Sequence, residues 1–548
     1  MTDAQPAIVV LGQGGLAVAL RLRVLYPQAR VWGLARRVNG ADATYERFGD
    51  TLRELYRQNT PIIALCAAGI VIRTLACELL GKTAEPPVLA VAEDGSAVVP
   101  LLGGLGGVNR MAREVAAHLA VAPAITTSGE LRFGTCLLDP PPGYVLADME
   151  QGKRFVSDLL AGEAVRIEGD APWLQRAGLP EAAGARLAVR VSPGTPAGPD
   201  ELLIHPRGVV LAVHGIGDDL IERAERLLGS RGLAKAAVGC VLAAPPAMAQ
   251  ASLQALAEYL DAPLRFAETL PEATELGLGL VVHRQPVDPN TCGRRRGRLA
   301  VVGLGPGVRD LMAPAVAAEL ARAEDVLGYE TYVRMAGPFH NEQVLHCTDN
   351  REELQRARHA FELAAQGRSV VVVSSGDPGV FAMASAVLEA LDGCEDPGWH
   401  LVDLQVLPGI SASLATAAWA GAPLGHDFCL MSLSDNLKPW AVIEKRLHLA
   451  AEADLAMAFY NPISRSRPWQ LGRALEILRQ YRTPPTPVVL GRDVARPGQQ
   501  LRVVNLGDLQ PEMVDMRTMV IVGSSTTRCI DRAGAAPWVY TPRWYPEV

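Results

Sequence analysis

The chain has 548 residues, a net charge of −7, 49% hydrophobic residues and only 5% aromatic residues. This length predicts two to four domains with ample apolar core. The acidic charge and the few aromatic residues argue against a nucleic-acid partner.

The nine cysteines are scattered, odd in number and form no CxxC pair, which is typical of proteins in a reducing cytoplasm. The amino terminus lacks a basic region before its first apolar run, and no apolar stretch is long enough to cross a membrane. We therefore expect a cytoplasmic protein without a membrane partner. No metal site is predicted.

The first segment, residues 7–25, is an apolar strand followed by a glycine turn and a helical pattern. Its turn, Gly12–Ala17, matches the GxGxxA form of a dinucleotide fingerprint. The second strand should then end near an acidic residue that holds a ribose, but residues 32–37 offer only arginines. A structural glycine turn is therefore favoured. The alternative, an NADP site, depends on Gly12, Gly14, Ala17 and Arg36.

Alternating apolar runs and helical patterns continue to residue 130. The sequence predicts strands at 61–65, 88–92 and 97–102 and a helix at 51–56. Two further helices are predicted to begin at the turn of residues 67–74 and at the glycine-rich run of residues 103–109. Three stretches in this region, Ala67–Arg73, Gly103–Asn109 and Pro123–Thr127, resemble the cobalt-precorrin-5A hydrolase family over about residues 6–130.

The hydrolase family carries a histidine where this chain has Gly104. Without an imidazole there is no obvious general base for lactone opening. The glycine run still leaves backbone N–H groups that suit a carboxylate. Two hypotheses stay open: the amino-terminal half is a module that binds a corrinoid intermediate, or it is an active lactone hydrolase.

Residues 131–297 give a weaker pattern. A proline- and glycine-rich composition predicts a small middle domain and linker at 131–207. Strands at 208–212 and 236–243 and helices at 218–228 and 245–260 predict a small α/β domain at 208–284. His214 follows the first of these strands, where a structural role is more common than a catalytic one. The arginine-rich segment 285–297 is predicted to be a linker.

Three further turns follow apolar strands within about a hundred residues. They lie in Leu299–Gly307, Val371–Phe381 and Leu404–Ala412, and each joins a strand to a small-residue turn. In a parallel α/β sheet, ligands bind beyond the carboxyl ends of the strands, so these turns predict one ligand cleft.

The order of these turns, followed by Ala458–Pro462 and Val522–Ser525, resembles the tetrapyrrole methylases, which use S-adenosylmethionine. Within that family, Asp427–Trp440 and Phe459–Arg467 resemble the precorrin-3B C17-methyltransferases of cobalamin synthesis. The resemblance covers roughly residues 298–530 and implies a class III methyltransferase fold with lobes 298–421 and 425–548. It also implies a tetrapyrrole substrate and a homodimer formed through this half. We thus expect a multi-domain α/β protein divided at 1–130, 131–207, 208–284, 285–297 and 298–548.

The resemblance also implies which residues bind the cofactor and the substrate. The predicted cofactor pocket contains Gly305, Pro306, Gly307, Gly376, Asp377, Val380, Phe381, Ser411, Ala412, Tyr460, Asn461, Gly523 and Ser524. Precorrins carry several carboxylates, which require cationic and amide donors. The predicted substrate residues are Asn436, Lys438, Arg465, Arg467 and Arg528. If 464–467 is an extended loop, Arg465 and Arg467 project from the same side toward the cleft. Methylation at C17 is coupled to ring contraction, and Asp435 or Tyr460 could move the proton that this step requires.

Overall fold

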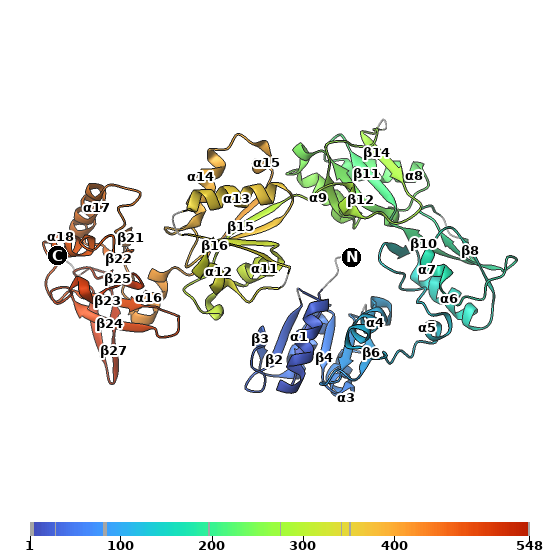
Figure 1. The fold of residues 1–548 in the computed structure, drawn as a ribbon, viewed down its shortest axis with the longest axis horizontal. Helices are drawn as coiled ribbons and strands as arrows, with labels where there is room; N and C mark the ends of the chain where they lie inside the picture. Colours follow the sequence, from blue (N-terminus) through green and yellow to red (C-terminus); the bar gives the residue numbers. More distant parts are fainter. Residues whose placement is uncertain are drawn as a thin grey trace. The chain divides into compact units, whose positions relative to one another are not determined.

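The computed structural model describes residues 5–27, 29–79, 85–195, 198–273, 276–340, 342–349 and 352–545. The chain divides into two compact units, Met1–Arg296 with His340–Glu342 and Gly297–Phe339 with Gln343–Val548. We describe each unit separately, with elements labelled as in Figure 1.

The first unit begins with a six-stranded sheet in the order β3-β2-β1-β4-β5-β6, in which only β6 is antiparallel to its neighbour. Strands β1 and β4 are entirely buried, as expected for apolar strands with helices on both faces. The strands are β1 (Ala7–Val10), β2 (Arg30–Leu34), β3 (Ala43–Tyr45), β4 (Ile62–Leu65), β5 (Val88–Val91) and β6 (Val98–Leu102). The helices are α1 (Leu16–Leu25), α2 (Phe48–Arg57), α3 (Ala68–Leu75) and α4 (Val108–Leu119). Every strand and helix predicted in residues 7–119 is present.

A second sheet of the first unit has the order β7-β10-β9-β8. It contains β7 (Tyr144–Leu146), β8 (Val165–Glu168), β9 (Leu187–Val191) and β10 (Glu201–Pro206), with helices α5 (Ser128–Phe133), α6 (Met149–Leu160) and α7 (Pro172–Gln175). Phe133, Phe155 and Leu174 are buried in its core. The residues before 207 are therefore not a linker, because β10 is an inner strand of this sheet.

A third sheet of the first unit has the order β13-β12-β11-β14. Its elements are β11 (Val209–Val213), β12 (Val238–Ala243), β13 (Leu264–Phe266), β14 (Leu278–Val282), α8 (Leu220–Ser230), α9 (Ala251–Tyr259) and α10 (Pro289–Cys292). The last of these, α10, lies inside the predicted linker.

The second unit begins with a five-stranded, fully parallel sheet in the order β17-β16-β18-β15-β19. Its strands are β15 (Arg298–Gly303), β16 (Asp325–Tyr329), β17 (Val344–Thr348), β18 (Ser369–Ser374) and β19 (Asp403–Leu407). Its helices are α11 (Pro314–Arg322), α12 (Glu330–Ala336), α13 (Glu353–Ala365), α14 (Met383–Asp392) and α15 (Pro397–His400). Strands β18, β15 and β19 are parallel neighbours, so the three predicted turns lie at one edge of this sheet.

The second lobe of this unit contains a five-stranded sheet in the order β21-β22-β25-β23-β24 and a three-stranded sheet β20-β27-β26. Strands β21, β22 and β23 run in one direction, whereas β24 and β25 run in the other. The strands are β20 (Gly421–Ala422), β21 (Phe428–Ser432), β22 (Ala456–Tyr460), β23 (Pro487–Arg492), β24 (Gln500–Asn505), β25 (Thr518–Val522), β26 (Arg528–Arg532) and β27 (Ala535–Tyr540). The helices are α16 (Ala412–Ala420), α17 (Trp440–Glu452) and α18 (Gln470–Leu478).

Helix α16 corrects the predicted boundary between the lobes. We expected the first lobe to extend to residue 421. Instead, Ala417 and Ala420 of this helix are buried together with Ala458 and Ile521 of the second lobe. The chain therefore passes between the lobes immediately after the third turn, before α16.

Short 3₁₀ turns complete the fold: η1 (Gln13–Gly15), η2 (Ala76–Glu78), η3 (Gly104–Gly106), η4 (Lys235–Ala237), η5 (Pro245–Ala247), η6 (Arg309–Leu311) and η7 (Pro511–Met513). Within the part of the chain that the structure describes, no helix is both long and apolar enough to cross a membrane.

Candidate active site

The three turns of the first lobe are in direct contact. The backbone N–H of Gly376 donates to the carbonyl of Gly305 at 2.8 Å, and that of Gly305 donates in return at 3.2 Å. Both glycines have positive φ, 73° for Gly305 and 72° for Gly376, which side-chain-bearing residues rarely adopt. A Cβ atom on Gly409 would overlap the carbonyl oxygen of Gly376. Glycine is therefore required where these backbones meet.

Asp377 fastens the second turn to the third. Its Oδ1 accepts the N–H of Gly379 at 2.8 Å, and its Oδ2 accepts the N–H of Gly409 at 3.0 Å. The carboxylate therefore holds the backbone of two turns together, a role that the sequence did not predict. It still lies at the predicted cleft edge, half-buried.

Tyr460, at the end of β22, connects the second lobe to these turns. Its ring lies 5.2 Å from that of Phe381, centroid to centroid. Its hydroxyl accepts the N–H of Ser413 at 3.2 Å and is 2.9 Å from the Ser413 hydroxyl. Ser411 caps the same helix by accepting the N–H of Leu414. The structure thus brings Tyr460, Phe381 and Ser411 together at the start of α16.

A polar cluster follows β21 and β22. The amide of Asn461 donates to the hydroxyl of Ser432 at 3.1 Å, and Asn461 has a φ of 50°. Oδ2 of Asp435 accepts from the amide of the buried Gln470 at 3.1 Å. Asp435 and Asn461 therefore stand on adjacent loops at the edge that also carries Tyr460.

Lys438 faces Phe381 and borders a small cavity. Its ammonium lies 5.9 Å from the centroid of the Phe381 ring, a cation–π contact. The cavity, about 80 Å³, is also lined by Met431, Ser432 and Arg446. Burial, together with the neighbouring positive charge of Arg446, lowers the pKa of Lys438. Two cations border one cavity here, which favours an anionic ligand. The sequence analysis missed Arg446, which lies on α17 and belongs to none of the motifs.

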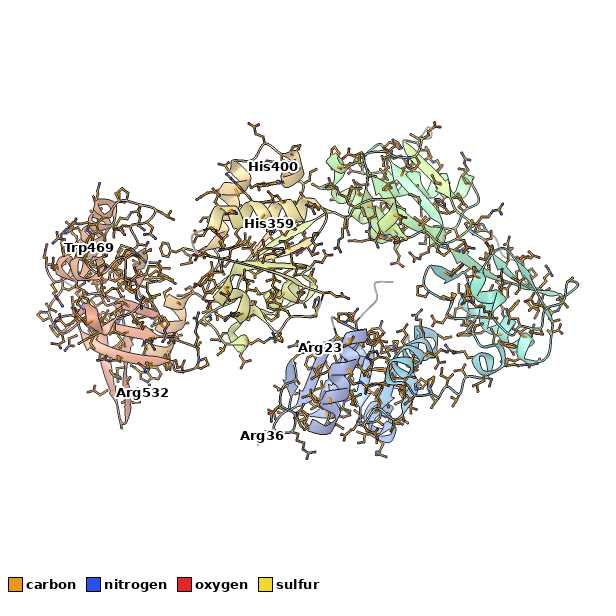
Figure 2. The ribbon with its side chains drawn as sticks, in the orientation of Figure 1. Arg23, Arg36, His359, His400, Trp469 and Arg532 are labelled. Carbon is orange, nitrogen blue, oxygen red and sulfur yellow. The ribbon has the colours of Figure 1, made fainter. Side chains whose placement is uncertain are left out.

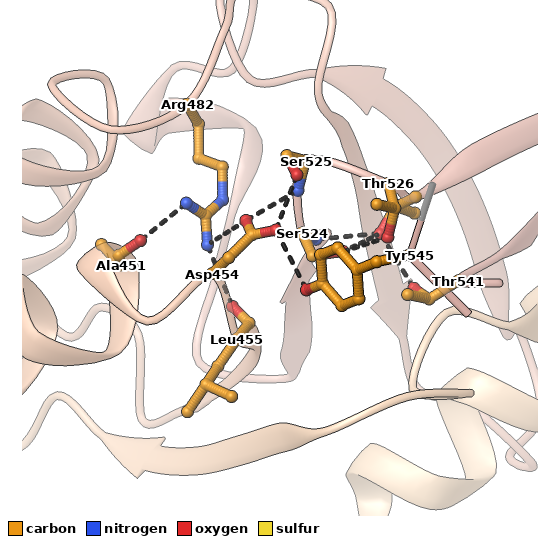
Figure 3. A network of polar contacts seen from close by, with 10 residues as sticks. Ala451, Asp454, Leu455, Arg482, Ser524, Ser525, Thr526, Thr541 and Tyr545 are labelled. Carbon is orange, nitrogen blue, oxygen red and sulfur yellow. Dashed lines mark hydrogen bonds and ion pairs between the residues drawn. The ribbon is translucent and has the colours of Figure 1, made fainter. Parts of the chain in front are cut away.

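Gly523 and Ser524 do not belong to this pocket. Because β25 is antiparallel to β22, with Val522 opposite Met457, the turn after β25 lies at the amino end of β22. Figure 3 shows this turn beside Asp454, which accepts hydrogen bonds from Ser525. Tyr460 is at the opposite end of the same strand. We therefore correct the prediction that all thirteen cofactor residues line one pocket, because Gly523 and Ser524 lie at the other edge of the sheet.

The arginines after Tyr460 also differ from the prediction. Ser464 and Arg467 pair with each other in a tight turn, so this segment is not an extended loop. Arg465 is exposed, whereas Arg467 is 8% exposed and donates to the carbonyl of Asn461 at 3.4 Å. The two side chains therefore do not project together into the cleft. Among the other substrate candidates, Asn436 is exposed on the loop after β21, and Arg528 is exposed on β26.

The glycine turns of the first unit have different surroundings. A Cβ on Gly12 would lie 3.3 Å from a carboxylate oxygen of Glu93, and one on Gly14 would lie 3.6 Å from the other oxygen. This negative charge disfavours a dinucleotide pyrophosphate. Arg36 is exposed at the edge of this domain (Figure 2). These contacts do not favour the NADP alternative.

Two other predicted positions of the first unit can be described. A Cβ on Gly104 would meet no atom within 4 Å, so the glycine run is open there. A ring nitrogen of His214 lies 2.6 Å from the carbonyl of Pro271, which suits a structural role. Among the residues that the structure describes, no group of three or more His, Cys, Asp or Glu side chains is arranged to hold a metal ion.

The second unit thus consists of two α/β lobes whose loops meet at one edge, the arrangement expected for a class III methyltransferase. Residues 298–510 match the family model for tetrapyrrole (corrin/porphyrin) methylases, and residues 50–130 match that for the amino-terminal domain of cobalamin synthesis protein G.

The chain is 50% identical over 250 residues to a precorrin-3B C(17)-methyltransferase of Sinorhizobium sp, a match that spans 45% of this chain and 97% of the relative. It is also 50% identical over 263 residues to the cobalamin biosynthesis protein CobIJ of Mycobacterium tuberculosis, covering 46% of this chain and half of that protein. A crystal structure of the methyltransferase CobJ aligns with 56% identity and a TM-score of 0.42, covering 45% of this chain and all of that one. The chain belongs to the tetrapyrrole methylase family and is a methyltransferase.

Proposed function

We propose that the chain methylates precorrin-3B at C17, with S-adenosylmethionine as donor and with contraction of the ring to precorrin-4, in cobalamin biosynthesis. The observation that carries this proposal is the 50% identity to a precorrin-3B C(17)-methyltransferase over 97% of its length. Residues 298–510, which match the tetrapyrrole methylase family model, contain the three turns, Tyr460 and Lys438.

The turns of the first lobe suit the proposed cofactor. Phe381 and Ile410 are apolar, yet they remain 50% and 38% exposed on the second and third turns. Such exposed apolar side chains beside glycine turns that lack bulky side chains fit a flat heteroaromatic ring. S-adenosylmethionine, when bound, supplies an electrophilic methyl group. We assign its binding to Gly305, Pro306, Gly307, Gly376, Asp377, Val380, Phe381, Ser411, Ala412, Tyr460 and Asn461.

The remaining task of the protein is to align the tetrapyrrole and exclude water. Lys438, with Arg446 across the small cavity, provides a cationic position for one carboxylate arm. Asn436 lies two residues before Lys438 on the same loop, and we assign it to the substrate as well.

Asp435 is our candidate for the proton movement that ring contraction requires. Its Oδ1 accepts no hydrogen bond from the described residues, whereas its Oδ2 accepts from Gln470. The hydroxyl of Tyr460, the second candidate, already contacts both the N–H and the hydroxyl of Ser413. Asp435 is therefore more available to a substrate proton.

Mass spectrometry of the products formed by the full chain from precorrin-3B and S-adenosylmethionine tests this function. We expect a product with one added methyl group and a contracted ring. Conversion of a cobalt-bearing substrate alone would assign the chain to the cobalt-dependent route. A methylated product with an intact ring from Asp435→Asn, but not from Tyr460→Phe, would support the role of Asp435.

For the first unit, we propose binding of a corrinoid intermediate without catalysis. The match of residues 50–130 and the absence of an imidazole at Gly104 support this reading. The alternative is an active cobalt-precorrin-5A lactone hydrolase.

We also propose a cytoplasmic location and a homodimer. All nine cysteines are free thiols, as in a reducing compartment. Dimerisation through the methylase half is implied by the family resemblance, and sedimentation analysis of the full chain would test it.

A further inference from the structure

The loop after β23 carries an arginine that reaches from the second lobe to the first. Within this loop, Asp493 and Ala495 have φ angles of 49° and 57°, which cost energy for residues other than glycine. The conformation is nevertheless fixed. The N–H of Arg496 donates to the carbonyl of Asp493 at 2.9 Å, and the N–H of Ala495 donates to the side chain of Gln499 at 3.0 Å. Asp493 itself forms ion pairs with Arg492 and Arg517.

The guanidinium of Arg496 bridges two of the cofactor turns. Its Nε donates to the carbonyl of Pro306 at 2.8 Å, and its Nη2 donates to the hydroxyl of Ser375 at 3.0 Å. A Cβ on Gly307 would lie 2.5 Å from Cγ of Arg496, so the arginine stem occupies the space that this glycine leaves. Arg496 is thus seated against the first and second turns.

These two contacts leave donors unused. A guanidinium carries further N–H groups on Nη1 and Nη2, arranged in a planar fork that matches a carboxylate. No carboxylate of the described residues forms an ion pair with Arg496. The side chain is half-buried, where a cation without a counter-charge is unfavourable. A fixed cation with free donors, beside the cofactor turns, is therefore positioned to receive an anion.

We propose that Arg496 binds a carboxylate in the cleft between the lobes while it holds the turns of Pro306 and Ser375. This inference rests on the proposed methyltransferase function. The carboxylate could come from the amino-acid part of S-adenosylmethionine or from an acetate or propionate arm of the tetrapyrrole, and one experiment separates these sources.

Calorimetry on the full chain would compare three ligands: S-adenosylhomocysteine, which has the amino-acid carboxylate; 5′-methylthioadenosine, which lacks it; and precorrin-3B. The variants are Arg496→Gln and Arg496→Lys. Arg502→Gln, which removes one exposed cation from β24 of the same lobe, is the matched control.

If the cofactor supplies the carboxylate, Arg496→Gln should lose roughly ten- to hundredfold affinity for S-adenosylhomocysteine, the range of one charge-assisted contact, and keep its affinity for 5′-methylthioadenosine. If the tetrapyrrole supplies it, precorrin-3B affinity should fall by a similar factor while both adenosine ligands bind normally. Arg496→Lys should recover part of either loss, because it restores the charge without the fork.

Equal losses for S-adenosylhomocysteine and 5′-methylthioadenosine would overturn the proposal, since Arg496 would then only hold the turns. Unchanged affinity for all three ligands would overturn it as well. A wild-type chain that binds no S-adenosylhomocysteine would instead contradict the proposed function itself.

Discussion

Replacement of Asp377 tests whether its carboxylate holds the turns together or meets the charge of the cofactor. In the structure, both oxygens already accept backbone N–H groups, from Gly379 and from Gly409. Gly379 is exposed, so water can replace its lost partner, whereas Gly409 is half-buried and regains less hydration. An unsatisfied, partly buried N–H costs about 1–2 kcal/mol. Asp377→Ala should therefore loosen the third turn and weaken cofactor binding about tenfold, without unfolding the chain.

Asp377→Asn separates the two roles, because its amide oxygen can still accept from Gly409 although the negative charge is gone. We expect this variant to bind within about threefold of the wild type, with equal changes for S-adenosylmethionine and S-adenosylhomocysteine. Calorimetry with both ligands, and circular dichroism as a check on folding, would measure this. A much larger loss for the sulfonium ligand than for the neutral one would refute the reasoning and assign Asp377 to charge balance.

Three further predictions concern the substrate and the first unit. Burial and Arg446 lower the pKa of Lys438, so its charge is lost at a lower pH than that of an ordinary lysine. Precorrin affinity should fall as pH rises through this lowered pKa, and Lys438→Arg should abolish that fall in binding titrations. Arg467→Ala should lower the melting temperature and destabilise by about 1–2 kcal/mol, because the buried guanidinium contacts Asn461, whereas the exposed Arg465→Ala should leave melting unchanged. The full chain should release no acetaldehyde from cobalt-precorrin-5A, and acetaldehyde release by the wild type would restore the hydrolase alternative. The Gly104→His variant should fold normally, because a Cβ at this position meets no atom within 4 Å.

The contact between the three turns of the first lobe could be predicted because the sequence signal for each turn is local. Each apolar run that ends in glycine and proline marks a strand and its turn, and a parallel sheet places all such turns at one edge. The contact between Gly305 and Gly376 follows directly from this rule.

Other features depend on contacts that the local pattern does not encode. The tight turn of Ser464 and Arg467 contains no glycine in its centre, so nothing distinguishes it from an extended loop. The hairpin of β26 and β27 was missed, since β26 is exposed along its whole length and lacks an alternating apolar face. Arg496 lies about 190 residues from Pro306, its partner in the first lobe, and no motif connects them.

The direction of β25 shows why motif order alone does not define a site. Strands β21, β22 and β23 all end at the cleft edge, where their loops carry Asp435, Tyr460 and Arg496. Because β25 runs the other way, its small-residue turn faces the opposite edge, although its sequence resembles the ligand-binding turns. There, Asp454 accepts from Ser525 and pairs with Arg482, which is 6% exposed (Figure 3). The arginine also donates to the carbonyl of Ala451 at the end of α17. The turn after β25 therefore connects the helix layer to the sheet. The loop of Arg496, and not the turn of Gly523 and Ser524, contacts the first and second turns of the first lobe.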